Sequence, residues 1–145
     1  MQNISEVDAV STYGKQLEDA VKLRMRSDVE VGVCLSGGLD SSSITSISSN
    51  VLRQVSTAKI KSIHAKAGEK AIDESGYAMQ VAEFCDTNLV VVEPTLNDFI
   101  ENIDHVIRIQ EEPFGSPSIF LQYFVLKEAR KQNCLVMLDG QGGDE

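Results

Sequence analysis

Two glycine-rich segments carry the residues whose types and spacing could do chemistry. The first is Ser36–Ser42 (SGGLDSS), which separates the apolar run Val29–Leu35 from an apolar pattern with helical spacing. The second is Asp139–Glu145 (DGQGGDE), which follows the apolar run Cys134–Leu138. Glycines and hydroxyl side chains weaken strands and helices locally, so packing alone does not explain them. We interpret both segments as ligand-binding loops.

The first loop has the composition of a phosphate site. Gly37 and Gly38 allow unusual backbone dihedrals and a close approach of another group, and the free amides of the following helix attract an anion. Asp40 would repel a phosphate unless a divalent cation lay between them, so it predicts Mg²⁺. The segment is neither a Walker A motif nor G-x-G-x-x-G. Further donors come from hydroxyl groups, those of Ser36, Ser41 and Ser42.

The second loop adds acidic residues at the end of another strand. If that strand lies beside the first one, the two loops face each other across the switch point of a parallel sheet. Asp40 and Asp144 could then share one Mg²⁺ above a triphosphate, which makes them the candidate metal ligands and catalytic residues. The alternatives are that Asp40 and the serines only cap a helix, and that the second loop is a solvated turn.

The loops must be positioned by predicted helices and strands, which alternate along the chain. Alternating strands and helices favour right-handed crossovers and a parallel sheet with helices on both faces. We therefore expect an open, doubly wound α/β fold with four strands. The predicted helices are Val7–Ser27, Asp40–Ser56, Asp73–Cys85, Leu96–Ile109 and Ser118–Gln132, and the predicted strands are Val29–Leu35, Ile60–Ala65, Leu89–Val92 and Cys134–Leu138.

Two of these helices have apolar stripes that predict buried faces. The helix over Val7–Ser27 carries Val10, Tyr13, Leu17, Ala20 and Val21 on one side, and the helix over Leu96–Ile109 carries Leu96, Phe99, Ile100, Ile103 and Ile107.

Composition limits the classes of function. The 145 residues are 42% hydrophobic, which suits a single domain with a core. A net charge of −9 argues against broad binding to nucleic-acid backbones. The three cysteines, Cys34, Cys85 and Cys134, are odd in number and widely spaced, which indicates reduced thiols in a cytoplasmic protein. No apolar run approaches the roughly 20 residues that a membrane span needs.

Together, SGGLDSS and DGQGGDE resemble the synthetase domain of glutamine-dependent asparagine synthetases. That domain is a pyrophosphate-loop ATP pyrophosphatase with an adenine nucleotide α-hydrolase-like fold, and β-lactam synthetases are close relatives. Ala71–Asn88 is similar to the family's helix with an acidic start, and Glu111–Ser118 (EEPFGSPS) to its acidic segment with proline.

The resemblance implies a reaction and a set of ligands. ATP would activate a carboxylate, expected to be the aspartate side chain, as an acyl-adenylate with release of pyrophosphate, and ammonia would displace AMP. The implied pyrophosphate-binding residues are Ser36, Gly37, Gly38, Asp40, Ser41 and Ser42. Asp40 and Asp144 would bind Mg²⁺. The implied neighbours of the adenosine are Leu35, Ala65, Gly140 and Gln141.

Three positions depart from the family pattern. Asp139 stands where serine is common, and Gln141 stands where glutamate is frequent. Lys66 stands where glycine is usual, so we expect an altered adenine wall.

The resemblance also implies that the chain is a partial domain, truncated at its C-terminus. The family's N-terminal glutaminase domain and its C-terminal helical part have no counterpart here, so we expect the chain alone to be inactive in asparagine synthesis. The glutaminase domain is an expected partner in the intact protein. An exposed sheet edge would favour self-association, and a homodimer is left open.

Several alternatives stay open at this point. The same loops would serve a β-lactam synthetase-like enzyme or an amidotransferase with a different acceptor, or a non-catalytic nucleotide-binding module. Asp73 and Glu74 are interpreted either as a helix start or as residues near the nucleotide or acceptor. Glu111 and Glu112 are interpreted either as residues that orient substrate or metal or as a solvated turn. Two histidines are not assigned to chemistry: His64 is expected to be packed and His105 to be solvated.

Overall fold

The computed structural model describes residues 4–68 and 73–142. All the predicted helices and strands are present, with ends that differ by a few residues. In chain order they are α1 (Glu6–Arg24), β1 (Val31–Cys34), α2 (Leu39–Arg53), β2 (Lys61–Ala65), α3 (Ser75–Phe84), β3 (Asn88–Val92), α4 (Leu96–Gln110), α5 (Pro117–Lys131) and β4 (Val136–Leu138).

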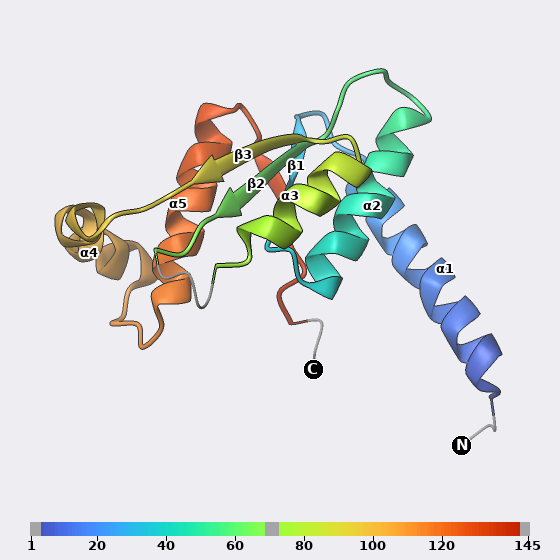
Figure 1. Ribbon diagram of the computed structural model, residues 1–145, viewed down its shortest axis with the longest axis horizontal. Helices are drawn as coiled ribbons and strands as arrows, with labels where there is room; N and C mark the ends of the chain where they lie inside the picture. Colours follow the sequence, from blue (N-terminus) through green and yellow to red (C-terminus); the bar gives the residue numbers. More distant parts are fainter. Residues whose placement is uncertain (1–3, 69–72, 143–145) are drawn as a thin grey trace.

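The four strands form one parallel sheet in the order β3-β2-β1-β4. The strand β1 pairs with β2 on one side and with β4 on the other, so that Gly32 lies between Lys61 and Met137. From β1 to β3 the chain moves steadily toward one edge, and it then crosses back to place β4 beside β1 (Figure 1). This reversal is a switch point of the kind at which ligands bind in open parallel sheets, and it meets the condition under which the two glycine-rich loops face each other.

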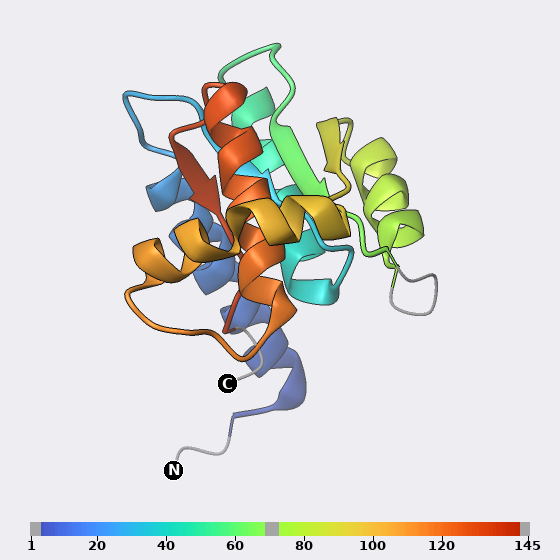
Figure 2. The ribbon, with the colours of Figure 1, turned by 90° about the vertical axis from the view of Figure 1, so that its left-hand side faces the viewer.

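Helices cover both faces of the sheet, as predicted. Successive residues of a strand point to opposite faces, and β1 shows this directly. Val33 is buried in a cluster with Val21 of α1 and Leu138 of β4, against which Ile44 of α2 packs. Cys34 packs instead against a cluster that includes Val125 of α5. Figure 2 shows α5 and α2 on opposite sides of the strands.

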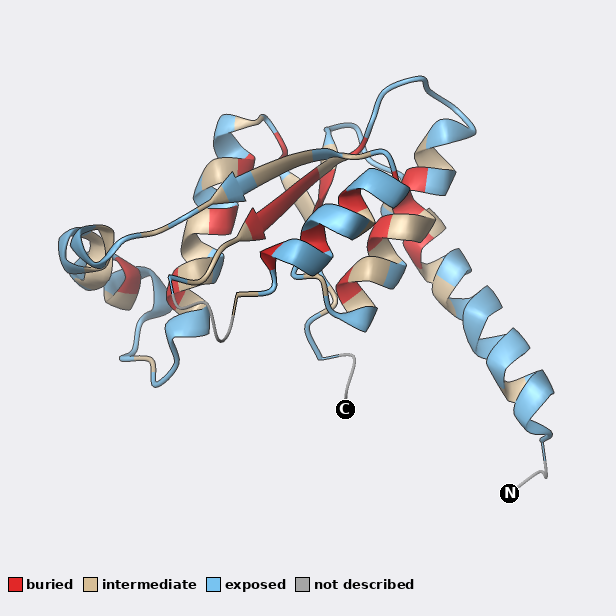
Figure 3. Ribbon diagram, in the orientation of Figure 1, coloured by how far each residue is buried: buried red, intermediate tan, exposed pale blue. Residues whose placement is uncertain are grey.

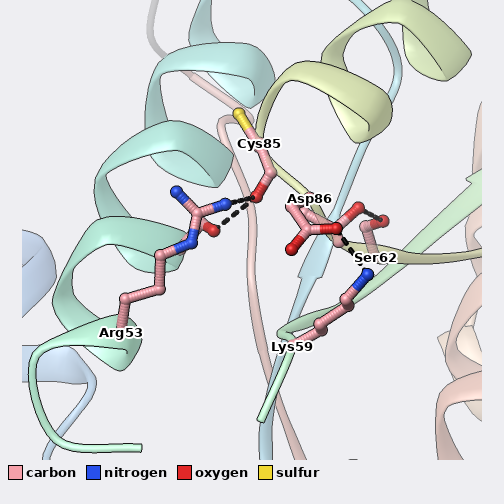
Figure 4. Close-up of polar contacts among 7 residues, drawn as sticks. Arg53, Lys59, Ser62, Cys85 and Asp86 are labelled. Carbon is pink, nitrogen blue, oxygen red and sulfur yellow. Dashed lines mark hydrogen bonds and ion pairs between the residues drawn. The ribbon is translucent and has the colours of Figure 1, made fainter. Parts of the chain in front are cut away.

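A set of polar contacts fixes the N-terminal edge of the sheet (Figure 4). The carbonyl oxygen of Cys85, at the end of α3, accepts a hydrogen bond from Ser49 Oγ at 2.6 Å and another from the guanidinium group of Arg53. Lys59 pairs with Asp86 at 2.5 Å. The contacts of Ser49 and Arg53 tie α2 to the turn that leads into β3, and the Lys59–Asp86 pair ties the same turn to the segment before β2. Both lie at the end of the sheet opposite the loops.

The predicted buried face of α1 is only half correct. Val21 is 4% exposed, but Val10 and Tyr13 are 67% and 62% exposed. The N-terminal half of α1 extends away from the rest of the fold (Figures 1 and 3), so most of its apolar stripe is left exposed. Along the described residues, no helix has the length and apolar character needed to cross a bilayer.

The predicted core stripe of α4 also needs correction. Leu96 and Ile100 are exposed, whereas Val106 is fully buried and Phe99 and Ile103 are half-buried. The helix packs mainly against α5, where the rings of Phe99 and Phe120 lie 4.9 Å apart in an edge contact. Because α5 covers only part of the apolar stripe, Leu96 and Ile100 in the first turns of α4 stay exposed to solvent.

Candidate functional site

The loops that follow β1 and β4 meet at the carboxyl edge of the sheet, as predicted from their positions in the sequence. A cleft of about 380 Å³ lies between them. The first loop contributes Ser36, Gly38, Leu39, Asp40 and Ser41, and the second contributes Asp139, Gly140, Gln141 and Gly142. Asp144 lies outside the described residues, so a Mg²⁺ ion shared by Asp40 and Asp144 stays a prediction.

Hydroxyl groups organise the first loop internally. The amide of Ser36 donates to Ser41 Oγ at 3.2 Å, and the two hydroxyl oxygens lie 2.9 Å apart. The amide of Gly38 donates to Ser36 Oγ at 3.2 Å, and Ser41 Oγ donates to the carbonyl of Gly38 at 3.2 Å. These bonds shape the loop around the buried Ser41 side chain and leave Ser36 exposed at the cleft.

The start of α2 carries amides that can bind an anion. Gly38 is the N-cap residue and makes no side-chain capping bond. The helical hydrogen bonds begin with the amide of Ser42, which donates to the carbonyl of Gly38 at 3.0 Å. The first amides of a helix have no partner within it, and the positive end of the helix dipole lies at the same place. The alternative in which Asp40 and the serines only cap this helix therefore loses its main support.

Gly37 lets the first loop lie against α3. Its φ of +100° is in the region that favours glycine, and an added Cβ would be 2.8 Å from the Cβ of Tyr77 and 2.9 Å from the amide of Ala78. The first turn of α3 therefore packs directly against the first loop at Gly37.

An apolar pocket of about 550 Å³ adjoins the cleft. Leu35, which is 1% exposed, and Ala65 line it, and their place beside an adenine stays a prediction. Its other residues are Cys34, Ser36, Ile63, His64, Ala67, Glu74, Ser118, Ile119, Leu121, Gln122, Val125, Asp139 and Gln141. Three of these, Ser36, Asp139 and Gln141, also line the cleft. Lys66 turns away to pair with Glu93 at 2.8 Å, so its side chain does not form the wall.

Sequence reasoning missed the wall that α5 supplies. Ser118 and Gln122 are four residues apart on this helix and both line the pocket. Gln122 Nε2 donates to Asp139 Oδ2 at 3.5 Å, and the amide of Gln141 donates to Asp139 Oδ1 at 3.2 Å. Asp139 therefore shapes the second loop and joins it to α5. The i, i+4 spacing of Ser118 and Gln122 was the available signal, but spacing does not tell which strand a helix covers.

The titratable groups near the pocket include no activated nucleophile among the described residues. Burial, and secondarily the Asp139 carboxylate, raises the pKa of the Cys34 thiol to about 12. Hydrogen bonds from Ser75 hold the pKa of Asp73 below its usual value. All three cysteines are free, with Cys85 and Cys134 buried and Cys34 half-buried, as expected for reduced thiols.

The remaining candidate residues lie beside helix ends, in the packed interior or at the surface. Asp73 and Glu74 immediately precede α3 and do not lie within it, and Glu74 reaches the pocket. Glu111 and Glu112 are exposed after α4. His64 is packed, at 3% exposed, and His105 is exposed, both as predicted.

The carboxylates of the cleft suit a magnesium–nucleotide complex better than a resident metal ion. Within residues 4–68 and 73–142, no three His, Cys, Asp or Glu side chains are arranged to hold a metal. Asp40 and Asp139 are the described carboxylates of the cleft. Mg²⁺ bound to phosphates takes only one or two protein carboxylates, and this donor set fits that requirement.

Comparison with known sequences identifies relatives of the chain. The sequence profile described as asparagine synthase matches residues 12–145. A Methanocaldococcus jannaschii protein, provisionally named glutamine-hydrolysing asparagine synthetase 2, is 41% identical over 131 residues, which are 90% of this chain and 24% of that protein. The glutamine-hydrolysing asparagine synthetase 1 of Bacillus subtilis is 29% identical over 127 residues, 88% of this chain and 19% of that protein. The chain thus spans about a fifth to a quarter of these relatives.

Solved structures share the fold at low sequence identity. The ammonia-dependent NAD synthetase of Campylobacter jejuni aligns with a TM-score of 0.55 and 16% identity, over 87% of this chain and 54% of that chain. A U34-tRNA thiolase of Methanococcus maripaludis aligns with a TM-score of 0.64 and 16% identity, over 87% and 44%. The expected adenine nucleotide α-hydrolase-like fold is confirmed.

Proposed function

The chain belongs to the asparagine synthase family, and we propose that it is the ATP-binding part of an ATP-dependent amide-forming ligase. The observation that carries the proposal is the convergence of two loops, around Asp40 and Gly140, beside an apolar pocket. In this proposal the 145 residues form part of a larger synthetase domain. Their match to only a fifth to a quarter of two relatives supports that division.

We place the nucleotide across the two neighbouring spaces. The adenosine would occupy the pocket between Leu35, Ala65 and α5, because its volume of about 550 Å³ falls in the usual range for small-molecule sites. The triphosphate would lie over the amides and hydroxyls of the first loop. Ser36 and Gln141 line both spaces, so they would lie where the sugar meets the phosphates.

The proposed reaction starts with attack of a carboxylate oxygen on the α-phosphorus of ATP. The bond between the α-phosphorus and the bridging oxygen breaks, and pyrophosphate leaves with the electron pair. The fixed amides at the start of α2 and the hydroxyl of Ser36 would stabilise this developing charge. Mg²⁺ bound by Asp40, with Asp144 as its proposed second ligand, would supply charge neutralisation.

The acyl-adenylate would then react with ammonia. The nitrogen attacks the carbonyl carbon, the nitrogen loses a proton, and AMP leaves to give the amide. We propose aspartate as the acceptor and asparagine as the product, with a glutaminase domain of the intact protein as the source of ammonia. The names of the relatives support these assignments, and three free thiols support a cytoplasmic location. The homodimer stays a prediction.

Calorimetric titration of ATP tests the proposal at the site itself. With Mg²⁺ present, we expect Asp40→Asn to weaken ATP binding by about tenfold, or about 1.4 kcal/mol. Without Mg²⁺, the same substitution removes a carboxylate that repels the phosphates, so binding should stay equal or become tighter. Asp104→Asn, the same chemical change on the exposed side of α4, is the matched control.

Two results would contradict the proposal. Failure of the unmodified chain to bind ATP would remove the assigned ligand. An ATP affinity that is unchanged by removal of Mg²⁺ and by Asp40→Asn would favour a non-catalytic nucleotide-binding module. Discrimination of the acceptor needs the intact protein, in which aspartate-dependent release of pyrophosphate from ATP is the expected readout.

A further inference from the structure

A buried histidine connects the phosphate loop to the start of α3. His64 lies on β2 and is 3% exposed, and both of its ring nitrogens have partners. Nδ1 lies 2.8 Å from the carbonyl oxygen of Leu35, and Nε2 lies 3.0 Å from Ser75 Oγ. The proposed reaction does not use this side chain for chemistry, although it lines the apolar pocket.

The bond to Leu35 has a defined direction. A backbone carbonyl can only accept, so a proton must be on Nδ1 of His64. Leu35 is 1% exposed, and a buried carbonyl that loses its hydrogen-bond donor destabilises the fold. The Leu35 amide is already used, because it donates to the carbonyl of Ile63 at 2.9 Å.

The carbonyl that His64 holds belongs to the first peptide unit of the phosphate loop. The other end of the same unit is the amide of Ser36, which donates to Ser41 Oγ at 3.2 Å. A trans peptide is planar, with its carbonyl and amide pointing in opposite directions. His64 and Ser41 therefore hold the two ends of one plane, and a rotation of that plane would break both hydrogen bonds.

The second nitrogen of His64 reaches Ser75, the first residue of α3. Ser75 Oγ, 4% exposed, donates its single proton to Asp73 Oδ1 at 2.5 Å and therefore can only accept at its contact with Nε2 of His64. The Ser75 amide donates to the same Asp73 oxygen at 3.1 Å. The Asp73–Ser75 turn also contacts the phosphate loop directly, since an added Cβ on Gly37 would be 3.2 Å from the carbonyl oxygen of Glu74.

We propose that His64 is a positioning residue for nucleotide binding, which fixes the Leu35–Ser36 peptide plane and joins it to the Asp73–Ser75 turn. The inference rests on the proposed function for its effect on ATP. The peptide plane sets where the Ser36 side chain and the following amides point. Loss of the Nδ1 donor therefore disturbs phosphate binding although His64 contacts no phosphate.

Two amide substitutions separate positioning from simple packing. The side-chain amide of Asn reaches about as far as Nδ1 of His, and that of Gln about as far as Nε2. His64→Asn keeps a donor for Leu35, so we expect Mg²⁺–ATP affinity within about threefold of the unmodified chain, less than 1.4 kcal/mol. His64→Gln keeps a partner for Ser75 but not for Leu35, and we expect about tenfold weaker binding. His105→Gln on the surface is the control.

Amide hydrogen exchange and nitrogen NMR provide readouts that need no nucleotide. We expect faster exchange at the Ser36 amide in His64→Gln than in His64→Asn, with Val33 in β1 unchanged. In the unmodified chain we expect a proton on Nδ1 of His64. A ring protonated only on Nε2, or equal ATP affinity and equal Ser36 exchange in the two variants, would overturn the inference. Absence of ATP binding to the unmodified chain would instead contradict the proposed function, and the exchange and NMR readouts would still test His64.

Discussion

Gly140 and Asp40 touch across the switch point with no space for a side chain between them. A Cβ added to Gly140 would be 2.8 Å from the Cβ of Asp40 and 3.0 Å from the amide nitrogen of Ser41. The atoms that such a Cβ would meet belong to the backbone of α2 and the Cβ of Asp40, and they cannot move by a change of rotamer. The missing side chain of Gly140 therefore sets the distance between the two loops and the width of the cleft that both of them line.

Gly140→Ala should widen that contact and weaken nucleotide binding. The added methyl group must displace either the second loop or the first turn of α2, so we expect Mg²⁺–ATP affinity to fall by tenfold or more, at least about 1.4 kcal/mol. Gly76→Ala is a suitable control because an added Cβ there meets nothing within 4 Å. Calorimetric titration gives the comparison, and equal affinity of the two variants would show that the loops do not bind the phosphates together.

Two other glycines should respond to alanine with opposite signs. Gly37→Ala introduces a Cβ at a φ of +100° and within 3 Å of Tyr77 and Ala78, so we expect a loss of about 1–3 kcal/mol in the free energy of unfolding. Gly14→Ala in α1 meets nothing within 4 Å and removes a glycine from a helix interior, so we expect a gain of up to about 1 kcal/mol. Urea denaturation measures both, and a stable Gly37→Ala variant would contradict the packing of the loop on α3.

The parallel sheet could be predicted from the sequence, and the meeting of the two loops only on one condition. Each loop follows a continuous apolar run, and the loops face each other if those two runs form neighbouring strands, which the strand order shows. The apolar faces of α1 and α4 were less predictable. Periodicity shows which side of a helix is apolar, but it does not show whether another element covers Tyr13 or Ile100.

The pocket wall was also outside the reach of sequence reasoning. Gln122 and Asp139 are 17 positions apart and meet because α5 packs across β2 and β3 and β4 then follows it beside β1. The partners of His64 depend in the same way on the start of α3. Asp144, on which the metal prediction depends, lies outside the described residues, so the sequence remains its only support.

The exposed start of α4 predicts a contrast in stability along one helix. Ile100 is 63% exposed and should tolerate Ile100→Gln within about 0.5 kcal/mol. Val106 is fully buried, and Val106→Ala should cost about 1.5 kcal/mol or more through lost burial. Thermal or urea unfolding of the two variants tests this pattern, and a large cost at Ile100 would show that this surface is covered in solution.

The thiol of Cys34 should be unreactive although it lines the apolar pocket. Its pKa of about 12 in the folded chain, against an ordinary value of 9.0, follows first from burial and then from the Asp139 carboxylate. At pH 8 we therefore expect slow alkylation by iodoacetamide, and rapid alkylation once urea unfolds the chain, since the thiolate is the reacting form. Peptide mass mapping assigns the modified position.

The same shift predicts a pH dependence with a definite sign. The folded state binds the Cys34 proton more tightly than the unfolded state, so this contribution to stability is fully present below pH 9 and is lost as the pH rises toward 12. Cys34→Ala should remove that part of the alkaline loss of stability, and Cys34→Ser offers a polar replacement of similar size for comparison. Rapid alkylation of Cys34 in the folded chain at pH 8 would contradict both expectations, because it would require a thiolate that burial beside Asp139 disfavours.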